Sequence, residues 1–440
     1  MNPTRASSLL LLATLSLTAT LSAQRPVQMP SISEILRDAA QGEQTNPGGG
    51  GTRDAEIATP SGRRAAPPTG QAGLPAWLRT GVRVTYYSGS ATFAGVRQQL
   101  VPGENGAWVD SQGRRYRVED TANSAGAGYT QWEFAEVRPG RIATNMRNYI
   151  FADAGMQAVT RVSSEGIVGD ANGLSDIWLP PAALRAKLAA NELGVRRGPY
   201  ELGGRTYDAI VIESKGSSGF LRYTYDLDSG LLLVMSSSSI GASVRTPDGD
   251  TSTTGAGSTM IAVAQLRDVR TPDVPWLGQA APQWVRDGAA FAYAGTYRNS
   301  ITEGSVAPWR CDARITLGGV ASNAAIGTIE TRLDYGNGQG QNGRVPCVYG
   351  PGAATNLWID PAALQKLQRG QLLDRDPITG WQLSFAGSDG RYATIVERGT
   401  ADEQSYTYDL QTGLMVATTS RQQQGPAVIT ISLELQQQRQ

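Results

Sequence analysis

The feature that most constrains this chain is an internal duplication. Residues 223–231 read Tyr-Thr-Tyr-Asp-Leu-Asp-Ser-Gly-Leu, and residues 406–414 read Tyr-Thr-Tyr-Asp-Leu-Gln-Thr-Gly-Leu. Alternating aromatic and β-branched residues that lead into an Asp, a Gly and an apolar segment are typical of a β-hairpin. An Asp at the turn can accept amide hydrogens, and Gly can adopt the positive φ that closes the loop. The sequence therefore assigns structural turn roles to Asp226, Gly230, Asp409 and Gly413.

Other matching segments keep the same order in both halves of the sequence. They are Trp77–Gly81 with Trp284–Gly288, Trp178–Leu184 with Trp358–Leu364, Tyr207–Glu213 with Tyr392–Glu397, and Met260–Arg267 with Val428–Gln436. Matches that keep their order indicate a tandem repeat. We therefore predict two β-rich repeat lobes, at residues 74–273 and 281–440, and expect the repeated tryptophans to anchor their cores.

Within each half, strand-like runs alternate with Gly- and Asn-rich turns, as in Arg115–Glu119, Thr130–Val137 and Ile326–Leu333. A period of two is typical of β-strands. The clearest helix begins at Pro361, because Asp360 before it can cap free amides. We predict a mainly β fold of two tandem homologous lobes, each a curved antiparallel sheet with one short helix. Such a sheet must cover an apolar face, by curling into a half-barrel or barrel or by packing as a sandwich.

The N-terminus is typical of an export signal. A positive charge precedes the apolar stretch Leu9–Leu21, and a small-residue cleavage site ends at Ala23. We predict a signal peptide at residues 1–23 and an exported protein, periplasmic or extracellular, with no transmembrane segment in the mature protein. Residues 24–73 are predicted to form a flexible Gly- and Pro-rich linker with a short helix near 31–41.

Composition excludes several classes of function. The sequence has no histidine, which removes Ser-His-Asp and Cys-His catalysis and zinc sites with histidine ligands. Its 39 basic and 39 acidic residues give no basic excess, which argues against a nucleic-acid partner. No nucleophile elbow and no phosphate-binding loop is present. The sequence favours a protein that is not an enzyme, and it leaves open a hydrolase that uses two carboxylates.

The sequence predicts no metal and no cofactor. The segment Asp226-x-Asp228-x-Gly230 resembles the start of a calcium loop, but the bidentate carboxylate that such a loop supplies further on is missing. The second hairpin has Gln411 in place of Asp228. Turn chemistry alone accounts for the aspartates.

Cys311 and Cys347 are the two cysteines, and both lie in the second half. In an exported protein an isolated pair is most simply a disulfide. Closing a span of about 36 residues would contribute roughly 4 kcal/mol to stability if the effect is loop entropy. The sequence therefore predicts a disulfide between them.

Tryptophan is the residue with the clearest potential for ligand binding, because indoles stack on sugars and line apolar pockets. The tryptophans repeated in both halves are expected in the cores. The candidate ligand-facing aromatics come from the unrepeated ones: Trp108, Trp132, Trp309 and Trp381.

The hairpins at Tyr223–Leu233 and Tyr406–Val416 end a strand in Tyr-Asp and resume it after Gly-Leu. This pattern resembles the hairpin of bacterial lipoprotein-carrier proteins of the LolA/LppX type, over about ten residues in each copy. Strand density and lobe size are similar too, whereas the duplication departs from that family. The resemblance implies a half-barrel with an apolar concave face plugged by small helices.

These features favour an exported binding protein over other functions. Its partner is predicted to be a small apolar or carbohydrate ligand, or another protein of the cell envelope. One alternative is a structural component of a surface or matrix. The other is the carboxylate-based hydrolase, for which no Asp or Glu stands out by context.

Overall fold

The computed structural model describes much of the sequence after residue 73. The described residues are 74–96, 98–104, 107–117, 124–138, 140–151, 159–169, 174, 177–216, 219–240, 244–245, 251–252, 258–301, 304–305, 308–321, 323–336, 339–350, 352, 357–424 and 427–439. The predicted signal peptide, the linker and the helix near 31–41 lie outside them. Among the described residues, no helix is long and apolar enough to span a membrane.

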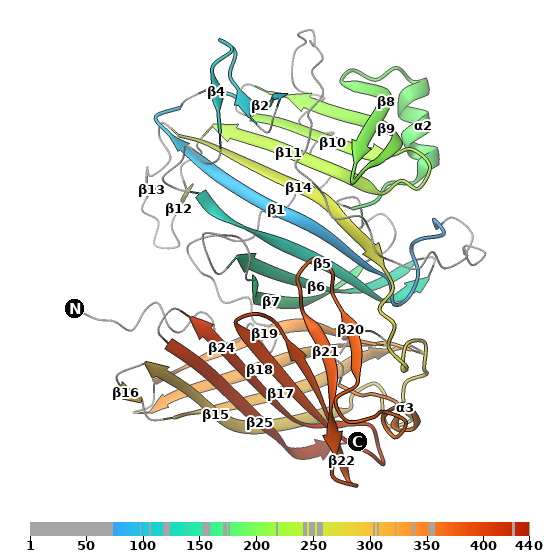
Figure 1. Ribbon diagram of the computed structural model, residues 1–440, viewed down its shortest axis with the longest axis vertical. Coiled ribbons are helices and arrows are strands. Elements are labelled where there is room, and N and C mark those ends of the chain that lie inside the picture. The colour runs from blue at the N-terminus through green and yellow to red at the C-terminus, as the bar shows by residue number, and fades with distance from the viewer. Residues whose placement is uncertain are drawn as a thin grey trace.

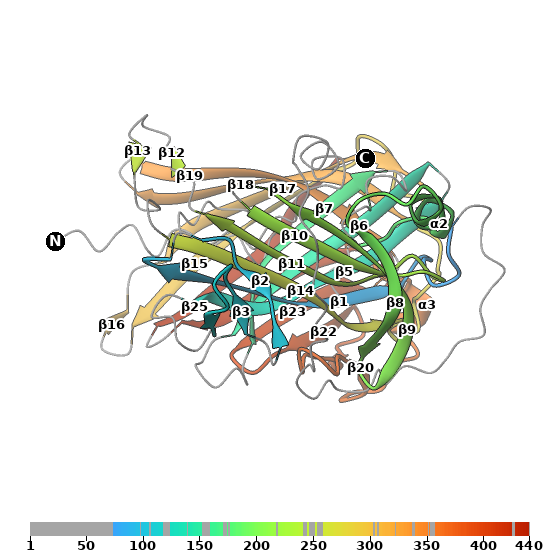
Figure 2. The same cartoon turned by 90° about the horizontal axis from the view of Figure 1, so that it is seen from above.

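The first lobe is built on one antiparallel sheet of nine strands in the order β7-β6-β5-β1-β14-β11-β10-β9-β8 (Figure 1; the same strands are seen from above in Figure 2). Its strands are β1 (Arg83–Ala94), β5 (Ser124–Arg138), β6 (Arg141–Phe151), β7 (Val159–Gly169), β8 (Val195–Leu202), β9 (Arg205–Lys215), β10 (Gly219–Asp226), β11 (Leu232–Ile240) and β14 (Ser258–Arg270). The short strands β2 (Val101–Pro102), β3 (Trp108–Val109) and β4 (Arg115–Tyr116) form a small sheet, and β12 (Val244–Arg245) pairs with β13 (Thr251–Ser252). Helix α2 (Pro181–Ala189) lies between β7 and β8 in the sequence and so connects the two edges of the large sheet.

The second lobe repeats this topology in the order β19-β18-β17-β15-β25-β24-β23-β22-β21-β20. Its strands are β15 (Ala290–Ile301), β17 (Trp309–Val320), β18 (Ala325–Gly336), β19 (Gln339–Tyr349), β20 (Leu372–Arg375), β21 (Gln382–Ser388), β22 (Tyr392–Arg398), β23 (Asp402–Asp409), β24 (Met415–Gln424) and β25 (Ala427–Arg439). The short β16 (Gly304–Ser305) pairs with β15, and α3 (Pro361–Leu364) takes the place of α2. The predicted fold is confirmed: two curved antiparallel sheets stand in tandem, and neither closes into a barrel.

Each sheet has a core face and an outer face. On β17, alternate residues such as Ala313 and Ile315 are buried in the second core, whereas Asp312 and Arg314 point to the outer face. The helices plug the core faces, with Leu184 of α2 in the first core and Leu364 of α3 in the second. A period of two therefore places one side of each such strand in an apolar core.

The duplicated hairpins lock each helix-bearing segment onto its sheet. Gly230 and Gly413 have φ of 73° and 71°. A Cβ at Gly230 would lie 1.9 Å from the Leu179 carbonyl oxygen, and one at Gly413 would lie 2.1 Å from that of Ile359. Only Gly allows this approach together with this φ. The Nε1 of Trp77 donates to the carbonyl of the Ser preceding Gly230 at 3.3 Å, and Trp284 makes the equivalent bond at 3.0 Å.

The aspartates before these glycines hold the turns. The Oδ2 of Asp226 accepts the amide of Ser229 at 3.1 Å, and the Oδ1 of Asp409 accepts the amides of Gln411 and Thr412, each at 2.9 Å. We expect Asp226→Ala and Asp409→Ala each to lower the free energy of unfolding by about 0.5–2 kcal/mol, by analogy with lost helix caps. Urea denaturation measures this loss. Equal losses with calcium and with a chelator are expected, and a calcium effect confined to Asp226 would contradict a turn role.

The predicted disulfide is wrong in this structure, because Cys311 and Cys347 are both free, buried thiols. Strand β18 separates them: Cys311 pairs with Leu333, and Cys347 pairs with Gly327, six residues away along the same strand. At about 3.3 Å per residue that offset alone is about 20 Å, whereas a disulfide needs Cα atoms within about 7 Å. Burial raises the pKa of each thiol to about 12.

Candidate functional site

Of the places in the described residues where charged side chains gather, two bear on function, and the first joins the lobes. We call it the interlobe network. The outer face of the first sheet contributes Arg83, Glu133, Arg147, Arg161, Asp268 and Arg270 to it, and the second lobe contributes Asp374, Asp376, Glu397 and Asp402. In the ion pairs of this network, both side chains are at most 10% exposed. Figure 1 shows β20 and β21 of the second lobe reaching toward β5 and β6 of the first.

The contacts in this network are short and cross between lobes. Arg83 Nη1 lies 3.2 Å from Asp376 Oδ2, and Arg161 Nη1 lies 3.0 Å from Glu397 Oε2. The guanidinium of Arg270 engages Asp374 through two bonds of 2.6 and 2.7 Å. Buried charges need such partners, because an unpaired charge in the interior is strongly destabilising.

The carboxyl groups of the network differ in pKa: that of Asp268 and that of Asp402 are raised from the ordinary value, and that of Asp376 is lowered. Burial raises the pKa of Asp268 to about 6, against the lowering effect of Arg270, and burial also raises the pKa of Asp402 to about 6. Burial opposes ionisation of Asp376 as well, but Arg83 and Arg270 outweigh it and lower its pKa to about 2. Asp268 Oδ1 and Asp402 Oδ1 accept no hydrogen bond from the described residues, which fits their preference for the proton.

Apolar contacts fill the rest of the interface. Trp381 of the second lobe packs against Tyr149 with ring centroids 5.9 Å apart, and the Arg161 guanidinium lies 4.7 Å from the Trp381 ring. A Cβ on Gly166 would lie 2.6 Å from the backbone of Cys347. The cavity of about 10 Å³ beside Arg83 and Trp381 is no larger than one water molecule. The interlobe network is therefore a structural joint with no room for a ligand.

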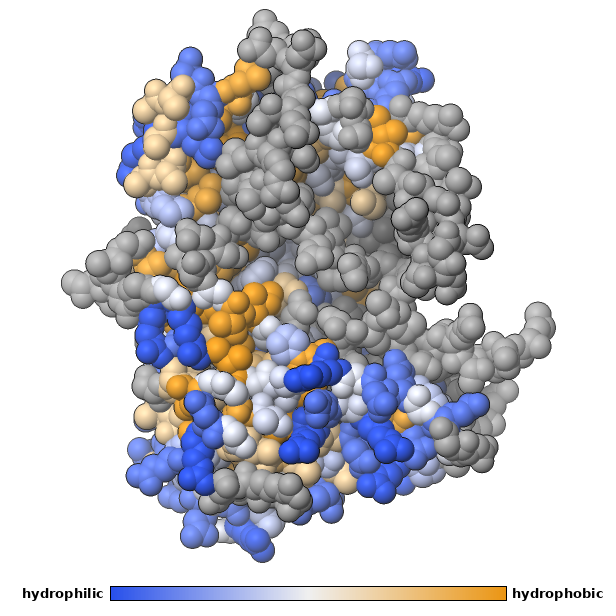
Figure 3. Space-filling view, turned by 180° about the vertical axis from the view of Figure 1, so that it is seen from behind, coloured by the Kyte–Doolittle hydropathy of each residue, from blue (hydrophilic) through white to orange (hydrophobic). Residues whose placement is uncertain are grey.

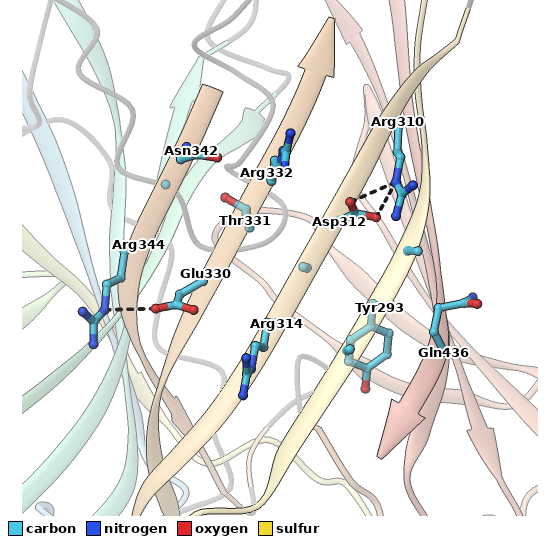
Figure 4. Close-up of a pocket in the computed structure, with 14 residues that line it drawn as sticks. Tyr293, Arg310, Asp312, Arg314, Glu330, Thr331, Arg332, Asn342, Arg344 and Gln436 are labelled. Atoms are coloured by element: carbon cyan, nitrogen blue, oxygen red, sulfur yellow. Dashed lines mark hydrogen bonds and ion pairs between the residues drawn. The ribbon is translucent and has the colours of Figure 1, made fainter. Parts of the chain in front are cut away.

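The second site is an open hollow of about 650 Å³ on the outer face of the second sheet. We call it the arginine hollow. It spans β15, β17, β18 and β19, with Gln436 of β25 at one side (Figure 4). The charged and amide side chains that β17, β18 and β19 contribute are Arg310, Asp312, Arg314, Glu330, Arg332, Asn342 and Arg344. Ala292 and Ala294 of β15 are small, and so leave space beside them.

Strand register sets the charge pattern of the hollow. One row across the sheet reads Ala292, Arg314, Glu330, Arg344, and the next reads Ala294, Asp312, Arg332, Asn342. Arg310 Nε lies 3.0 Å from Asp312 Oδ2, and Arg344 Nε lies 3.7 Å from Glu330 Oε1. The lining of the hollow thus contains four arginines and two carboxylates. Two further carboxylates lie nearby but do not line it: Asp334 pairs with Arg310, and Glu434 pairs with Ala294.

Two arginines remain available at the centre of the hollow. Arg314 and Arg332 are exposed, and neither forms an ion pair with any residue that the structure describes. Figure 4 shows them on β17 and β18, with Glu330 and Thr331 between them. Seen from behind, the second lobe presents many hydrophilic side chains interrupted by smaller apolar areas (Figure 3). A guanidinium without a partner offers up to five donors to a carboxylate or phosphate.

The structure places the four candidate aromatics away from the hollow. Trp108 is 3% exposed in a cluster beneath the small β2–β3–β4 sheet, and Trp381 is 3% exposed between the lobes. Trp132 is half-buried against the first core, and Trp309 stacks on Tyr297 at the edge of the second. A ligand-facing role for them stays a prediction. Within the described residues, no group of three or more Cys, Asp or Glu side chains forms a metal site.

The arginines of the hollow were missed by the sequence reading. The signal in the sequence is a charged or amide side chain at every second position of three successive strands: Arg310, Asp312 and Arg314, then Glu330 and Arg332, then Asn342 and Arg344. Such alternation is also the ordinary pattern of a solvated sheet face. Only the register between strands shows that the charges converge.

Comparison with known proteins identifies no family. No family model matches the sequence, and no curated protein matches it. A mutant of the fluorescent protein UnaG is similar over 33% of this protein and 94% of its own length, at 10% identity and a TM-score of 0.14. MucB, solved in complex with MucA(peri), is similar over 80% of this protein and 89% of its own length, at 11% identity and a TM-score of 0.18. Intact Ap-TbpB, with N and C lobes, is similar over 82% of this protein and 79% of its own length, at 8% identity and a TM-score of 0.10. At these scores the likenesses carry no weight for function.

Proposed function

We propose that this protein is an exported binding protein whose second lobe binds a carboxylate-bearing partner at the arginine hollow. The observation that carries the proposal is the pair Arg314 and Arg332, exposed at the centre of a hollow of about 650 Å³ with no ion pair among the described residues. Volumes of this size are typical of ligand sites. Arginine is suited to carboxylates, because its planar group binds them through two parallel hydrogen bonds.

An apolar ligand is supported less well by the geometry. The core face of each sheet is filled by the protein's own side chains, including Trp178 and Trp358 beside the helices. The end of the second lobe that meets the first is polar and closed by the interlobe network. Partner binding is thus the part of the sequence-based prediction that the site supports.

A hexaglutamate peptide tests the proposal on the full-length protein. We expect calorimetry to detect its binding to the wild type at low salt, and expect the affinity to fall at least about tenfold in Arg314→Ala/Arg332→Ala, roughly 1.4 kcal/mol. Higher salt should also weaken the binding, because the contacts are exposed.

A matched control comes from the exposed strand β8. The variant Arg196→Ala/Arg197→Ala removes the same two charges from the first lobe, where both side chains are exposed. It should bind hexaglutamate as tightly as the wild type. Equal loss of binding in both double variants would mean that net charge alone attracts the peptide, and would refute a site at the hollow.

A further inference from the structure

The arginine hollow is the second lobe's copy of the surface on which the lobes join. The repeat fixes this equivalence through Tyr86 and Tyr293. Tyr86 Oη donates to the Leu232 carbonyl at 2.9 Å, and Tyr293 Oη donates to the Met415 carbonyl at 2.8 Å, each at the start of the equivalent strand. Strand β15 thus matches β1, and β17, β18 and β19 match β5, β6 and β7.

Strand pairing extends the match to single positions. The row Thr85, Gln131, Arg147, Ser164 in the first sheet corresponds to Ala292, Arg314, Glu330, Arg344 in the second. The row Tyr87, Tyr129, Tyr149, Arg161 corresponds to Ala294, Asp312, Arg332, Asn342. These are the two rows that line the hollow.

In the first lobe, this surface holds carboxylates from strand ends and a turn of the second lobe. Gln131 Nε2 donates to Asp376 Oδ2 at 2.7 Å. Arg147 and Arg161 both engage Glu397, through contacts of 3.6 and 3.0 Å, and Trp381 covers the neighbouring Tyr149. The first lobe therefore shows how this face of the sheet binds another protein surface, because the second lobe is bound to it.

We propose that the arginine hollow is a docking surface for a partner protein that presents an acidic β-turn or acidic strand ends, as the second lobe does to the first. This inference rests on the proposed binding function and names the occupant. The charges of the hollow support an acidic occupant, although the arginines lie at other positions than in the joined face. Arg314, Arg332 and Arg344 stand where the first lobe has Gln131, Tyr149 and Ser164, whereas Glu330 and Asn342 stand where it has Arg147 and Arg161. With Arg310 the lining still has four arginines and two carboxylates, an excess of positive charge that favours a partner with carboxylates.

A second copy of this protein is a poorer occupant. Its acidic elements, Asp376 and Glu397, are already covered by its own first lobe. The first lobe has no charge at the matching positions: Ile395 pairs with Tyr406 and Ile212 with Tyr223, so Glu397 corresponds to Ser214 and Asp402 to Gly219. The first lobe therefore lacks the carboxylates that would face the arginines.

A library of disulfide-closed hairpin peptides, displayed on phage and selected against the full-length protein, tests this inference. We expect the enriched hairpins to carry two or more Asp or Glu at or beside the turn. Each should bind at least about tenfold more tightly than its linear, reduced form, because a preformed turn lowers the ordering cost. Binding should fall at least about tenfold in Arg314→Glu/Arg332→Glu and also in the milder Arg314→Ala/Arg332→Ala, and stay unchanged in Arg196→Glu/Arg197→Glu.

Four outcomes would overturn the inference, and the measurements distinguish them. Enriched hairpins without acidic residues, or acidic hairpins that bind the charge-reversed hollow equally well, would show that the face does not select an acidic turn. Equal affinity of closed and linear peptides, with hexaglutamate still bound, would refute the docking surface and leave the proposed function intact. Self-association of the wild type that Arg314→Glu/Arg332→Glu abolishes would assign the face to a second copy instead.

Discussion

Glu397→Ala should lower the free energy of unfolding by about 3–5 kcal/mol, the range measured when one partner of a buried ion pair is removed. Glu397 is 5% exposed and lies between two buried guanidinium groups, 3.0 Å from Arg161 Nη1 and 3.6 Å from Arg147 Nη1. Its removal leaves these positive charges in the interior with too few carboxylates. Chemical denaturation followed by tryptophan fluorescence measures the loss, because Trp381 lies beside Arg161.

The matched control lies on the strand next to Glu397. Glu403 forms an exposed ion pair with Arg398, and an exposed pair contributes only about 0–1 kcal/mol. Glu403→Ala should therefore change stability little. A second variant, Arg161→Met/Glu397→Leu, removes both charges and should recover much of the stability that Glu397→Ala loses. If Glu397→Ala costs no more than Glu403→Ala, the interlobe network does not hold the lobes together.

Stability should fall as the pH rises from about 4 to above 6, and Asp268→Asn/Asp402→Asn should remove much of that fall. Both carboxyl groups have their pKa raised by burial to about 6, above the ordinary value of 3.8. The folded protein therefore binds more protons than the unfolded state within this window, and the free energy of unfolding decreases with pH there. Asparagine stays neutral, as the protonated acid does.

At lower pH the free energy of unfolding changes in the opposite direction and falls as the pH falls. Asp376 has its pKa lowered to about 2, so its contribution is complete above pH 3.8 and is lost as the pH falls toward 2. These three groups together place the stability maximum of the network at about pH 4, below the window in which Asp268 and Asp402 ionise in the folded protein. The charged groups that influence the pKa of Asp268 are Arg83, Arg270 and Asp376, and the one that influences the pKa of Asp402 is Arg161. All of them belong to the interlobe network.

Denaturation curves at pH 4.5 and pH 7.5 measure this effect. We expect the double Asn variant to exceed the wild type by at most about 1 kcal/mol for each residue at pH 4.5 and by at most about 2–3 kcal/mol for each residue at pH 7.5, from about 1.4 kcal/mol for each pKa unit. Asp228→Asn is the control, because this carboxylate is 82% exposed. A double variant that is less stable than the wild type at pH 7.5 would show that both groups ionise as readily as in solvent.

Together these predictions separate the joint from the candidate binding site. The interlobe network determines stability and its dependence on pH, whereas Arg314 and Arg332 are exposed and should affect binding alone. Variants in the hollow should therefore unfold like the wild type. Network variants that remove one partner of a buried ion pair, such as Glu397→Ala, should unfold earlier, with hexaglutamate affinity unchanged wherever the second lobe stays folded.

Local pattern determined the fold. The duplicated hairpins, the period of two and the Pro361 helix start predicted two tandem β-rich lobes, because strand alternation, turn residues and capping depend on neighbours within a few residues. Asp360 caps α3 by accepting amides of Ala362 and Ala363 at 3.4 and 3.2 Å. These features are encoded within short segments, so a single sequence suffices to read them.

Contacts between distant segments were decided only by the tertiary structure. Cys311 and Cys347 are close enough in sequence for a disulfide, but β18 lies between them because the sheet order places it there. Arg83, Arg147 and Arg161 look like solvated charges in their own strands, and they are buried because another lobe covers that face. Arg314 and Arg332 come together only through the register of β17 and β18. Strand order, register and lobe docking result from the packing of whole sheets, and no local run of residues carries a signal for them.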